Sequence, residues 1–166
     1  MVTRGKSEEV INAYLAGIID GEGHVGINRT KTCPQRRVNP RYQAEVTVVN
    51  TDLRLMEFLV ANAGGSFHKR KKAKEWHKDT YSWKVTSTTA RDLCKRLHPF
   101  LFLKQKQAEW LVRLYEECNF NIRVLSEEEI QKRERIYQEI CKLNDSRRPQ
   151  RLTEGDLVCT EYKPGM

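Results

Sequence analysis

The stretch Leu15-Ala16-Gly17-Ile18-Ile19-Asp20-Gly21-Glu22-Gly23 decides how the rest of the chain is organised. Ahead of it, Ser7 is a good helix N-cap, and Glu8 and Glu9 place negative charge in the first helical turn. Apolar residues then recur three and four positions apart, which predicts a helix with a buried stripe of Val10, Ile11, Tyr14, Leu15, Ile18 and Ile19. Two glycines around a carboxylate end this helix, and strand-like alternation follows at once. The stretch therefore holds an acid at a corner between a helix and a strand.

A second face of this helix carries almost no side chain, because Ala13, Gly17 and Gly21 are four residues apart. Each glycine inside a helix costs about 1 kcal/mol relative to alanine, so close approach by another helix is the expected reason for them. If that helix belongs to a second copy, the acids at the two helix ends come together. Paired carboxylates suit Mg²⁺ and favour metal-assisted phosphodiester hydrolysis. Periodicity alone leaves an alternative, a core helix that ends in a tight turn with a solvated glutamate.

The composition indicates an intracellular globular protein with a polyanionic partner. The 166 residues include 30 Lys and Arg against 22 Asp and Glu, a net charge of +8. No apolar run approaches the roughly 20 residues that cross a bilayer, and the N-terminus lacks a hydrophobic signal core. We therefore expect no membrane partner. The five cysteines contain no Cys-x-x-Cys pair and the four histidines no i, i+4 pair, which argues against a disulfide framework or a zinc site.

Alternating polar and apolar residues predict two β-hairpins. The first joins residues 24–30 to residues 41–49, and the second joins a short strand around Phe67 to residues 80–87. Each strand has one apolar face suited to cover by helices and one polar face left over. Because a two-stranded ribbon fits the roughly 12 Å major groove of DNA, the polar faces are candidate readers of bases.

Cap residues and apolar spacing predict the remaining helices. They are residues 52–62 capped by Thr51, residues 90–97 capped by Thr88 or Thr89, residues 104–118, and a helix to about 143 capped by Ser126. The order of elements is typical of an α+β domain on one antiparallel sheet. We expect a single domain over residues 1–166, with its core at about 7–148 and a basic tail at 149–166.

Residues 15–23 closely resemble the signature of the LAGLIDADG homing endonucleases, a family with the αββαββα order predicted above. Leu97-His98-Pro99-Phe100-Leu101, followed by Leu103-Lys104-Gln105-Lys106-Gln107-Ala108, resembles the segment with the family's basic active-site lysine. Leu143-Asn144-Asp145-Ser146 resembles the C-terminal helix end of single-motif members from chloroplast introns. The resemblance implies a saddle-shaped antiparallel sheet on DNA, with extra C-terminal helices.

The resemblance also implies an activity. Single-motif members are homodimers that cleave both strands of a long pseudo-palindromic DNA site, across the minor groove, by metal-dependent hydrolysis that leaves 3′ overhangs. The motif helices would then pack across the two-fold axis through Ala13, Gly17 and Gly21. The implied cofactor is Mg²⁺, with Mn²⁺ or Ca²⁺ able to occupy the same site, and the implied compartment is a chloroplast or mitochondrion.

Matching positions imply roles for the acids of the motif. Glu22 matches the metal ligand of each subunit, where the family more often has aspartate, and Gly21 would offer its backbone carbonyl to the metal. Asp20 is interpreted as a structural residue that finishes the helix.

Three polar residues elsewhere match further catalytic positions. Lys104 matches the basic residue that polarises water or stabilises charge on the phosphate. Asn50 and Arg54 match residues that order solvent around the scissile phosphate. An asparagine before Thr-Asp is also a good turn and cap, which is the alternative interpretation of Asn50.

Base contacts are expected on the polar strand faces. The candidates are Asn28, Thr30, Arg41, Gln43, Glu45, Thr47, His68, Arg70 and Lys84. Two other functions remain open: an RNA-binding maturase that folds its host intron, and a DNA-binding protein of this fold that does not cleave. RNA is an expected partner only under the maturase hypothesis.

Overall fold

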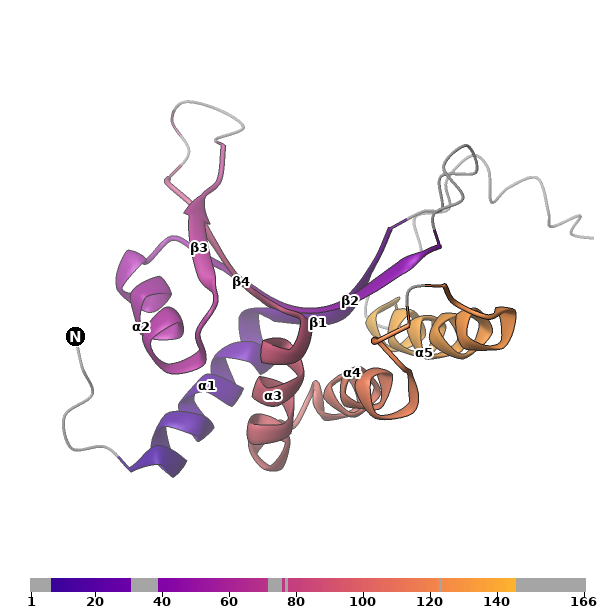
Figure 1. Ribbon diagram of the computed structural model, residues 1–166. Coiled ribbons are helices and arrows are strands. Elements are labelled where there is room, and N and C mark those ends of the chain that lie inside the picture. The colour runs from indigo at the N-terminus through magenta and orange to yellow at the C-terminus, as the bar shows by residue number, and fades with distance from the viewer. Residues whose placement is uncertain (1–6, 31–38, 72–75, 77, 123, 146–166) are drawn as a thin grey trace, which may run out of the picture.

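Helices pack on one face of a four-stranded sheet (Figure 1). A computed structural model describes residues 7–30, 39–71, 76, 78–122 and 124–145, so the predicted tail at 149–166 lies outside the described residues. The elements are α1 (Glu8–Glu22), β1 (Gly23–Thr30), β2 (Arg41–Asn50), α2 (Leu53–Ala63), β3 (Ser66–Lys69), β4 (Tyr81–Thr86), α3 (Ser87–Leu97), the 3-10 helix η2 (His98–Phe100), α4 (Gln105–Glu117) and α5 (Glu127–Asp145). This order confirms the predicted α+β class and its αββαββα core.

The strands are antiparallel and stand in the order β1-β2-β4-β3, so the two hairpins meet where β2 pairs with β4. The sheet is strongly curved. Its concave face is open, while α1, α3 and α4 cover the convex face and the two hairpins rise at the ends of the saddle (Figure 1). Residues on alternate strand positions therefore divide between a helix-covered core and an open surface.

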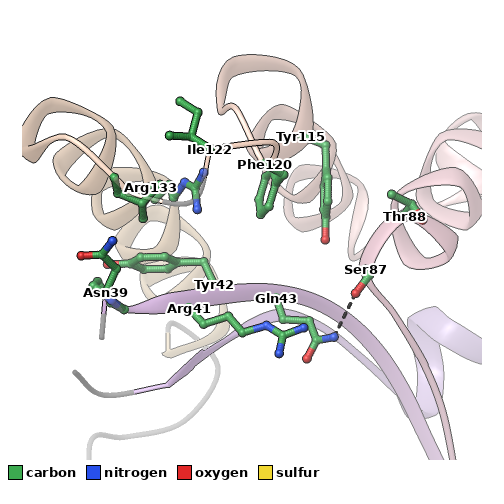
Figure 2. Close-up of a pocket in the computed structure, with 12 residues that line it drawn as sticks. Asn39, Arg41, Tyr42, Gln43, Ser87, Thr88, Tyr115, Phe120, Ile122 and Arg133 are labelled. Atoms are coloured by element: carbon green, nitrogen blue, oxygen red, sulfur yellow. Dashed lines mark hydrogen bonds between the residues drawn. The ribbon is translucent and has the colours of Figure 1, made fainter. Parts of the chain in front are cut away.

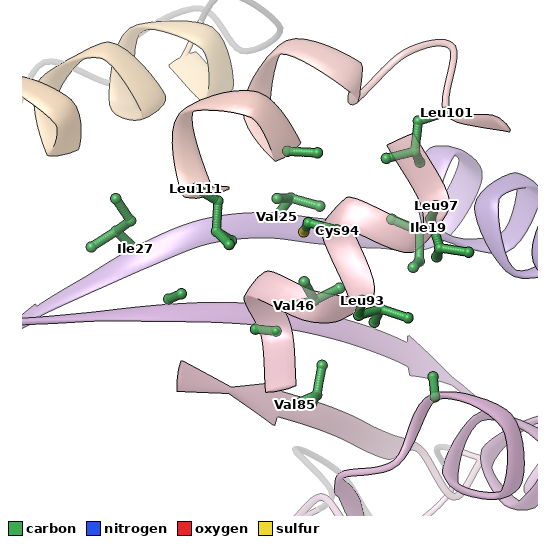
Figure 3. Packing of buried hydrophobic residues seen from close by; sticks show 14 of the residues in the cluster. Ile19, Val25, Ile27, Val46, Val85, Leu93, Cys94, Leu97, Leu101 and Leu111 are labelled. Carbon is green, nitrogen blue, oxygen red and sulfur yellow. The ribbon is translucent and has the colours of Figure 1, made fainter. Parts of the chain in front are cut away.

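The core lies between the convex face and the helices (Figure 3). Val25, Val46 and Val85 project into it from three adjacent strands and meet Leu93 of α3 and Leu111 of α4, all of them buried. Alternate residues of β2 are buried as predicted, which fixes the register of the central strand. Of the described helices, none is long and apolar enough to span a membrane.

The helix α1 buries a narrower stripe than predicted. Leu15 and Ile19 are buried, but Val10 and Tyr14 are 51% and 57% exposed, so the expectation that they pack inward is wrong. The physical reason is that α1 is covered on one side only, and these two residues border its small-residue face. Tyr14 instead meets Phe58 of α2 edge to face, with ring centroids 5.2 Å apart.

The cap of α2 is Asp52, and the prediction of Thr51 is wrong by one residue. The Asp52 carboxylate accepts a hydrogen bond from the backbone N–H of Arg54 at 2.9 Å, which satisfies a donor of the first helical turn. The helix ends as predicted at Gly64 and Gly65, whose φ values of 73° and 76° suit glycine.

The helix α3 begins at Ser87, directly after β4, and the predicted caps Thr88 and Thr89 lie inside it. Thr86 occupies the cap position without a side-chain capping bond. Ser87 has a φ of 59°, a left-handed conformation that turns the chain from strand to helix without a loop. The sequence pattern missed this start because serine seldom takes that conformation.

The last helix, α5, supports the outer end of the β1–β2 hairpin. The Asn144 side chain donates a hydrogen bond to the Val25 carbonyl at 3.1 Å. Arg29 of β1 forms an ion pair with Glu134 at 3.0 Å, and the Tyr42 hydroxyl donates to the same carboxylate. These polar contacts fix the hairpin on the helix layer below it.

Candidate functional site

The acid at the end of α1 lies beside the end of β2. Glu22 is exposed, and its carboxylate accepts a hydrogen bond from the Asn50 amide at 2.5 Å. The close packing of this corner explains the last glycine of the motif, because a Cβ on Gly23 would lie 2.7 Å from the Ile19 carbonyl oxygen. The fold thus brings together Glu22 and Asn50, two predicted site residues that are far apart in the sequence.

The second acid of the motif binds the loop that leads to α4. Asp20 accepts hydrogen bonds from the backbone N–H groups of Phe102 at 2.7 Å and Lys104 at 2.9 Å. The Lys104 ammonium donates to the Asp20 carbonyl oxygen at 2.5 Å, one of the carbonyls that the helix end leaves without an intrahelical partner. Lys104 is only 8% exposed. Asp20 therefore positions the predicted catalytic lysine at the same helix end that carries Glu22.

Removal of the Asp20 carboxylate should destabilise the fold. Asp20→Ala loses both backbone hydrogen bonds and Asp20→Asn keeps one acceptor, so we expect a loss of about 2–4 kcal/mol in unfolding free energy for alanine and roughly half for asparagine. Urea denaturation measures both values. Glu9→Ala, at an exposed position of the same helix, is the control. Equal losses for Asp20→Ala and the control would contradict this role of Asp20.

Arg54 is paired with an acid of its own helix end. Its guanidinium makes two contacts with the Asp52 carboxylate, at 2.7 Å and 3.1 Å, and the side chain remains 87% exposed. These hydrogen bonds lower the pKa of Asp52 to about 2. The sequence prediction did not include Asp52, although an acid two residues before an arginine at a helix start is a recognisable signal.

The pairing of Asp52 and Arg54 should affect how the unfolding free energy depends on pH in acid. A pKa lowered by folding stabilises the folded state above the unfolded value near 4, and this contribution is lost as pH falls to about 2. We therefore expect the unfolding free energy of Asp52→Asn to fall less steeply than that of the wild type between about pH 4 and pH 2. Urea titrations across this range measure the slope. Arg54→Gln should flatten it only in part, because the backbone N–H of residue 54 still donates to the Asp52 carboxylate, and a wild-type slope in both variants would refute the pairing.

The small-residue face of α1 is exposed. Ala13, Gly17 and Gly21 all face outward, and a Cβ added at either glycine would have no atom within 4 Å. Together with Tyr14 and with Leu55 of α2, these three residues line a groove of about 490 Å³. Nothing within the described part of the chain explains the lack of side chains on this face.

The concave face carries most of the predicted base contacts. Cross-strand register places Asn28 opposite Gln43 and Thr30 opposite Arg41. A further row crosses all four strands through His24, Thr47, Lys84 and Ser66.

Two predicted contacts on this face pair with each other. The Lys84 ammonium lies 2.6 Å from the Glu45 carboxylate. Toward the tip of the β3–β4 hairpin, His68 and Arg70 are exposed. The sequence prediction omitted Ser66, Ser82 and Thr86, which strict alternation along the two strands would have placed on the same face.

The candidate metal ligands of the described residues lie at the end of α1. Among the described residues, no three His, Cys, Asp or Glu side chains are grouped so that they could hold an ion. Asp20 is occupied by backbone N–H groups, which leaves the exposed Glu22 carboxylate and the carbonyls at the helix end. These hard oxygen donors fit Mg²⁺ or Ca²⁺ when water and a second carboxylate complete the shell.

Comparison with known structures identifies the same fold in DNA-cleaving enzymes. I-CvuI, a homing endonuclease solved with its target in the presence of Ca, has a TM-score of 0.70 and 18% identity, over 92% of this chain and 93% of that one. The archaeal intron-encoded homing endonuclease I-Vdi141I, complexed with DNA, has a TM-score of 0.68 and 14% identity, over 92% and 94%. The I-SmaMI LAGLIDADG homing endonuclease bound to cleaved DNA has a TM-score of 0.52 and 16% identity, over 85% of this chain but 45% of that one.

The sequence comparisons lead to the same family. No curated protein sequence matches the chain. The profile of the LAGLIDADG endonuclease family matches residues 15–111, more than half of the chain, from the first residue of the motif to the middle of α4. The chain therefore belongs to the LAGLIDADG endonuclease family.

Proposed function

We propose that this protein is a site-specific DNA endonuclease that acts as a homodimer and hydrolyses both strands of a pseudo-palindromic site. One observation carries the proposal: α1 exposes a face without side chains and ends in the exposed acid Glu22, beside Asn50 and the lysine that Asp20 positions. A helix with such a face can approach a copy of itself closely, and the approach doubles the acid.

Apolar side chains around the small-residue face support the dimer. Val10 and Tyr14 on α1, Leu53 at the start of α2, and Phe102 beside Asp20 are exposed by 51%, 57%, 41% and 88%. Exposed apolar residues gathered in this way are typical of a surface that a partner covers. The chain also spans 45% of I-SmaMI, so two copies match the length of that enzyme.

Each site residue has its own role in the proposed reaction. Each Glu22 would hold a divalent cation with the Gly21 carbonyl, and the bound cation would supply an activated water and stabilise charge on the phosphate. The Lys104 ammonium, fixed at the end of α1, stabilises the negative charge that develops on the phosphate. Asn50 orients the Glu22 carboxylate, and Arg54 can leave Asp52 to meet a DNA phosphate.

DNA would lie along the concave face, with each hairpin in a major groove. Strand residues Arg41, Gln43 and Asn28 have the donors and acceptors that read guanine and adenine edges. The two-fold axis between the motif helices places one half-site on each subunit and cleavage at the centre, where cuts across the minor groove leave 3′ overhangs.

Selection from randomised DNA tests the proposal without knowledge of the natural target. Duplexes that bind the protein in Ca²⁺ are recovered, cloned into a supercoiled plasmid, and then exposed to the protein in Mg²⁺. We expect a pseudo-palindromic consensus and linear plasmid with 3′ overhangs. Specific binding of DNA without any cut would contradict the proposed nuclease activity. Binding to RNA alone, and not to DNA, would favour the maturase hypothesis.

Arginine 70 offers a test of how the hairpin tip reads DNA. We expect Arg70→Ala to relax base preference at one position of each half-site, by roughly 1–3 kcal/mol of discrimination. Affinity measured on single-base variants of the selected site gives the answer. Uniform weakening on every sequence, with a shallower salt dependence, would instead identify Arg70 as a phosphate contact.

A further inference from the structure

A hydrogen bond fixes one of the candidate base readers. Gln43 lies on the concave face of β2 opposite Asn28, and its Nε2 donates to the Ser87 hydroxyl at 2.9 Å (Figure 2). Figure 2 shows Gln43 and Arg41 on the side of β2 away from the helices, with Ser87 at the adjacent end of β4. Of the two amide hydrogens of Gln43, one is therefore directed at the protein.

Ser87 holds a conformation that glycine would take more easily. It directly follows the last β2–β4 pair, Glu45 with Thr86, and its φ of 59° starts α3. A left-handed residue other than glycine carries backbone strain. Gln43 contacts the Ser87 hydroxyl, and a glycine at this position would have no such group.

Tyr115 of α4 lines the same pocket as Gln43 and Ser87 (Figure 2). Burial raises the pKa of the Tyr115 phenol. The Tyr115 ring is held by stacking on Phe120, with centroids 4.5 Å apart and an interplanar angle of 17°. Because Gln43 Nε2 donates to the Ser87 oxygen, the amide turns its nitrogen toward Ser87.

This arrangement selects what Gln43 can offer to DNA. One N–H and the carbonyl oxygen Oε1 remain for the base. Adenine presents the matching acceptor and donor in the major groove, N7 and N6–H, whereas guanine presents two acceptors that would place O6 against Oε1. We propose that Ser87 is a positioning residue that makes Gln43 specific for adenine, an inference that rests on the proposed function.

Two variants on the selected DNA site test this inference. The wild type should prefer adenine at one position of each half-site, and both Ser87→Ala and Ser87→Gly should reduce that preference by about fivefold or more per half-site. The two variants differ in backbone strain, since only glycine relieves the positive φ and raises Tm. If discrimination falls equally while Tm moves only in Ser87→Gly, the loss follows the hydroxyl and not the stability.

A double-mutant cycle separates positioning from a general structural effect. In a Gln43→Ala background, Ser87→Ala should change no base preference further, because the residue it positions is absent. Discrimination lost at other positions, or an additive loss in the double variant, would overturn the inference. If the wild type selects a DNA site and the Ser87→Ala variant keeps the adenine preference, the inference about Ser87 is overturned and the proposed function is not. A wild type that binds all DNA equally would overturn the proposed function as well.

Discussion

Glu22→Gln should abolish cleavage of the selected DNA site while the protein still binds that site. The amide keeps the size of the side chain and can still contact Asn50, but it no longer supplies the negative charge that holds a cation. Loss of several kcal/mol of transition-state stabilisation corresponds to a fall of about 1,000-fold or more in the single-turnover rate. Plasmid linearisation in Mg²⁺ and affinity in Ca²⁺ measure the two properties separately.

Two matched variants serve as controls for Glu22→Gln. Glu22→Asp shortens the acid by one methylene and restores the residue that the family more often has, so we expect it to cleave. Glu9→Gln removes an exposed acid at the other end of α1 and should leave the rate unchanged. Cleavage by Glu22→Gln at the wild-type rate would show that this carboxylate is not part of the reaction.

Gly17→Leu should separate the dimer and stop cleavage together. Within one chain a Cβ at this position meets nothing within 4 Å, so the monomer should keep its fold, and a better helix former should raise its stability by up to about 1 kcal/mol. In a two-fold interface the added bulk occurs twice. At roughly 1–3 kcal/mol for each overpacked residue, dimerisation should weaken by about 30-fold to 20,000-fold.

Analytical ultracentrifugation over a range of concentrations measures the dissociation constant, and circular dichroism measures the fold. Glu128→Leu, which adds the same side chain to an exposed position on α5, is the control and should remain dimeric. A folded Gly17→Leu protein that dimerises and cuts normally would refute the account of this face. The sign of the stability change is also informative, because a destabilised monomer would mean that the face packs within its own chain.

The sequence predicted most of the fold because its elements are locally consistent. Strict alternation in β2 and the apolar spacing of α4 each predict an element with one buried face, and in the folded chain each element buries one face. The small-residue face was predicted from spacing alone and is exposed in the structure. The wrong predictions concern where helices start and which residues at the edge of an apolar stripe are buried. Val10 and Tyr14 were predicted to be buried, because residue spacing cannot say which apolar side a partner covers.

The candidate site was only partly accessible to sequence reasoning. Glu22 and Lys104 were predicted from motifs, but contacts between distant residues needed the folded chain. Asp20 was interpreted as a structural residue that finishes the helix, and the sequence did not predict its bonds to the loop before α4, more than 80 residues away. The use of Ser87 was out of reach for the same reason, since a positive φ and a bond to β2 leave no pattern in the sequence.

Subunit mixing tests the central claim, that two copies of Glu22 act in one dimer, most directly. Wild-type and Glu22→Gln chains are unfolded together in urea, refolded in known proportions at constant total concentration, and assayed for linear plasmid. If both acids are required, double-strand cleavage falls as the square of the wild-type fraction, to about one quarter in an equal mixture. A linear fall, to about one half, would mean that each chain cuts both strands alone and would contradict the account.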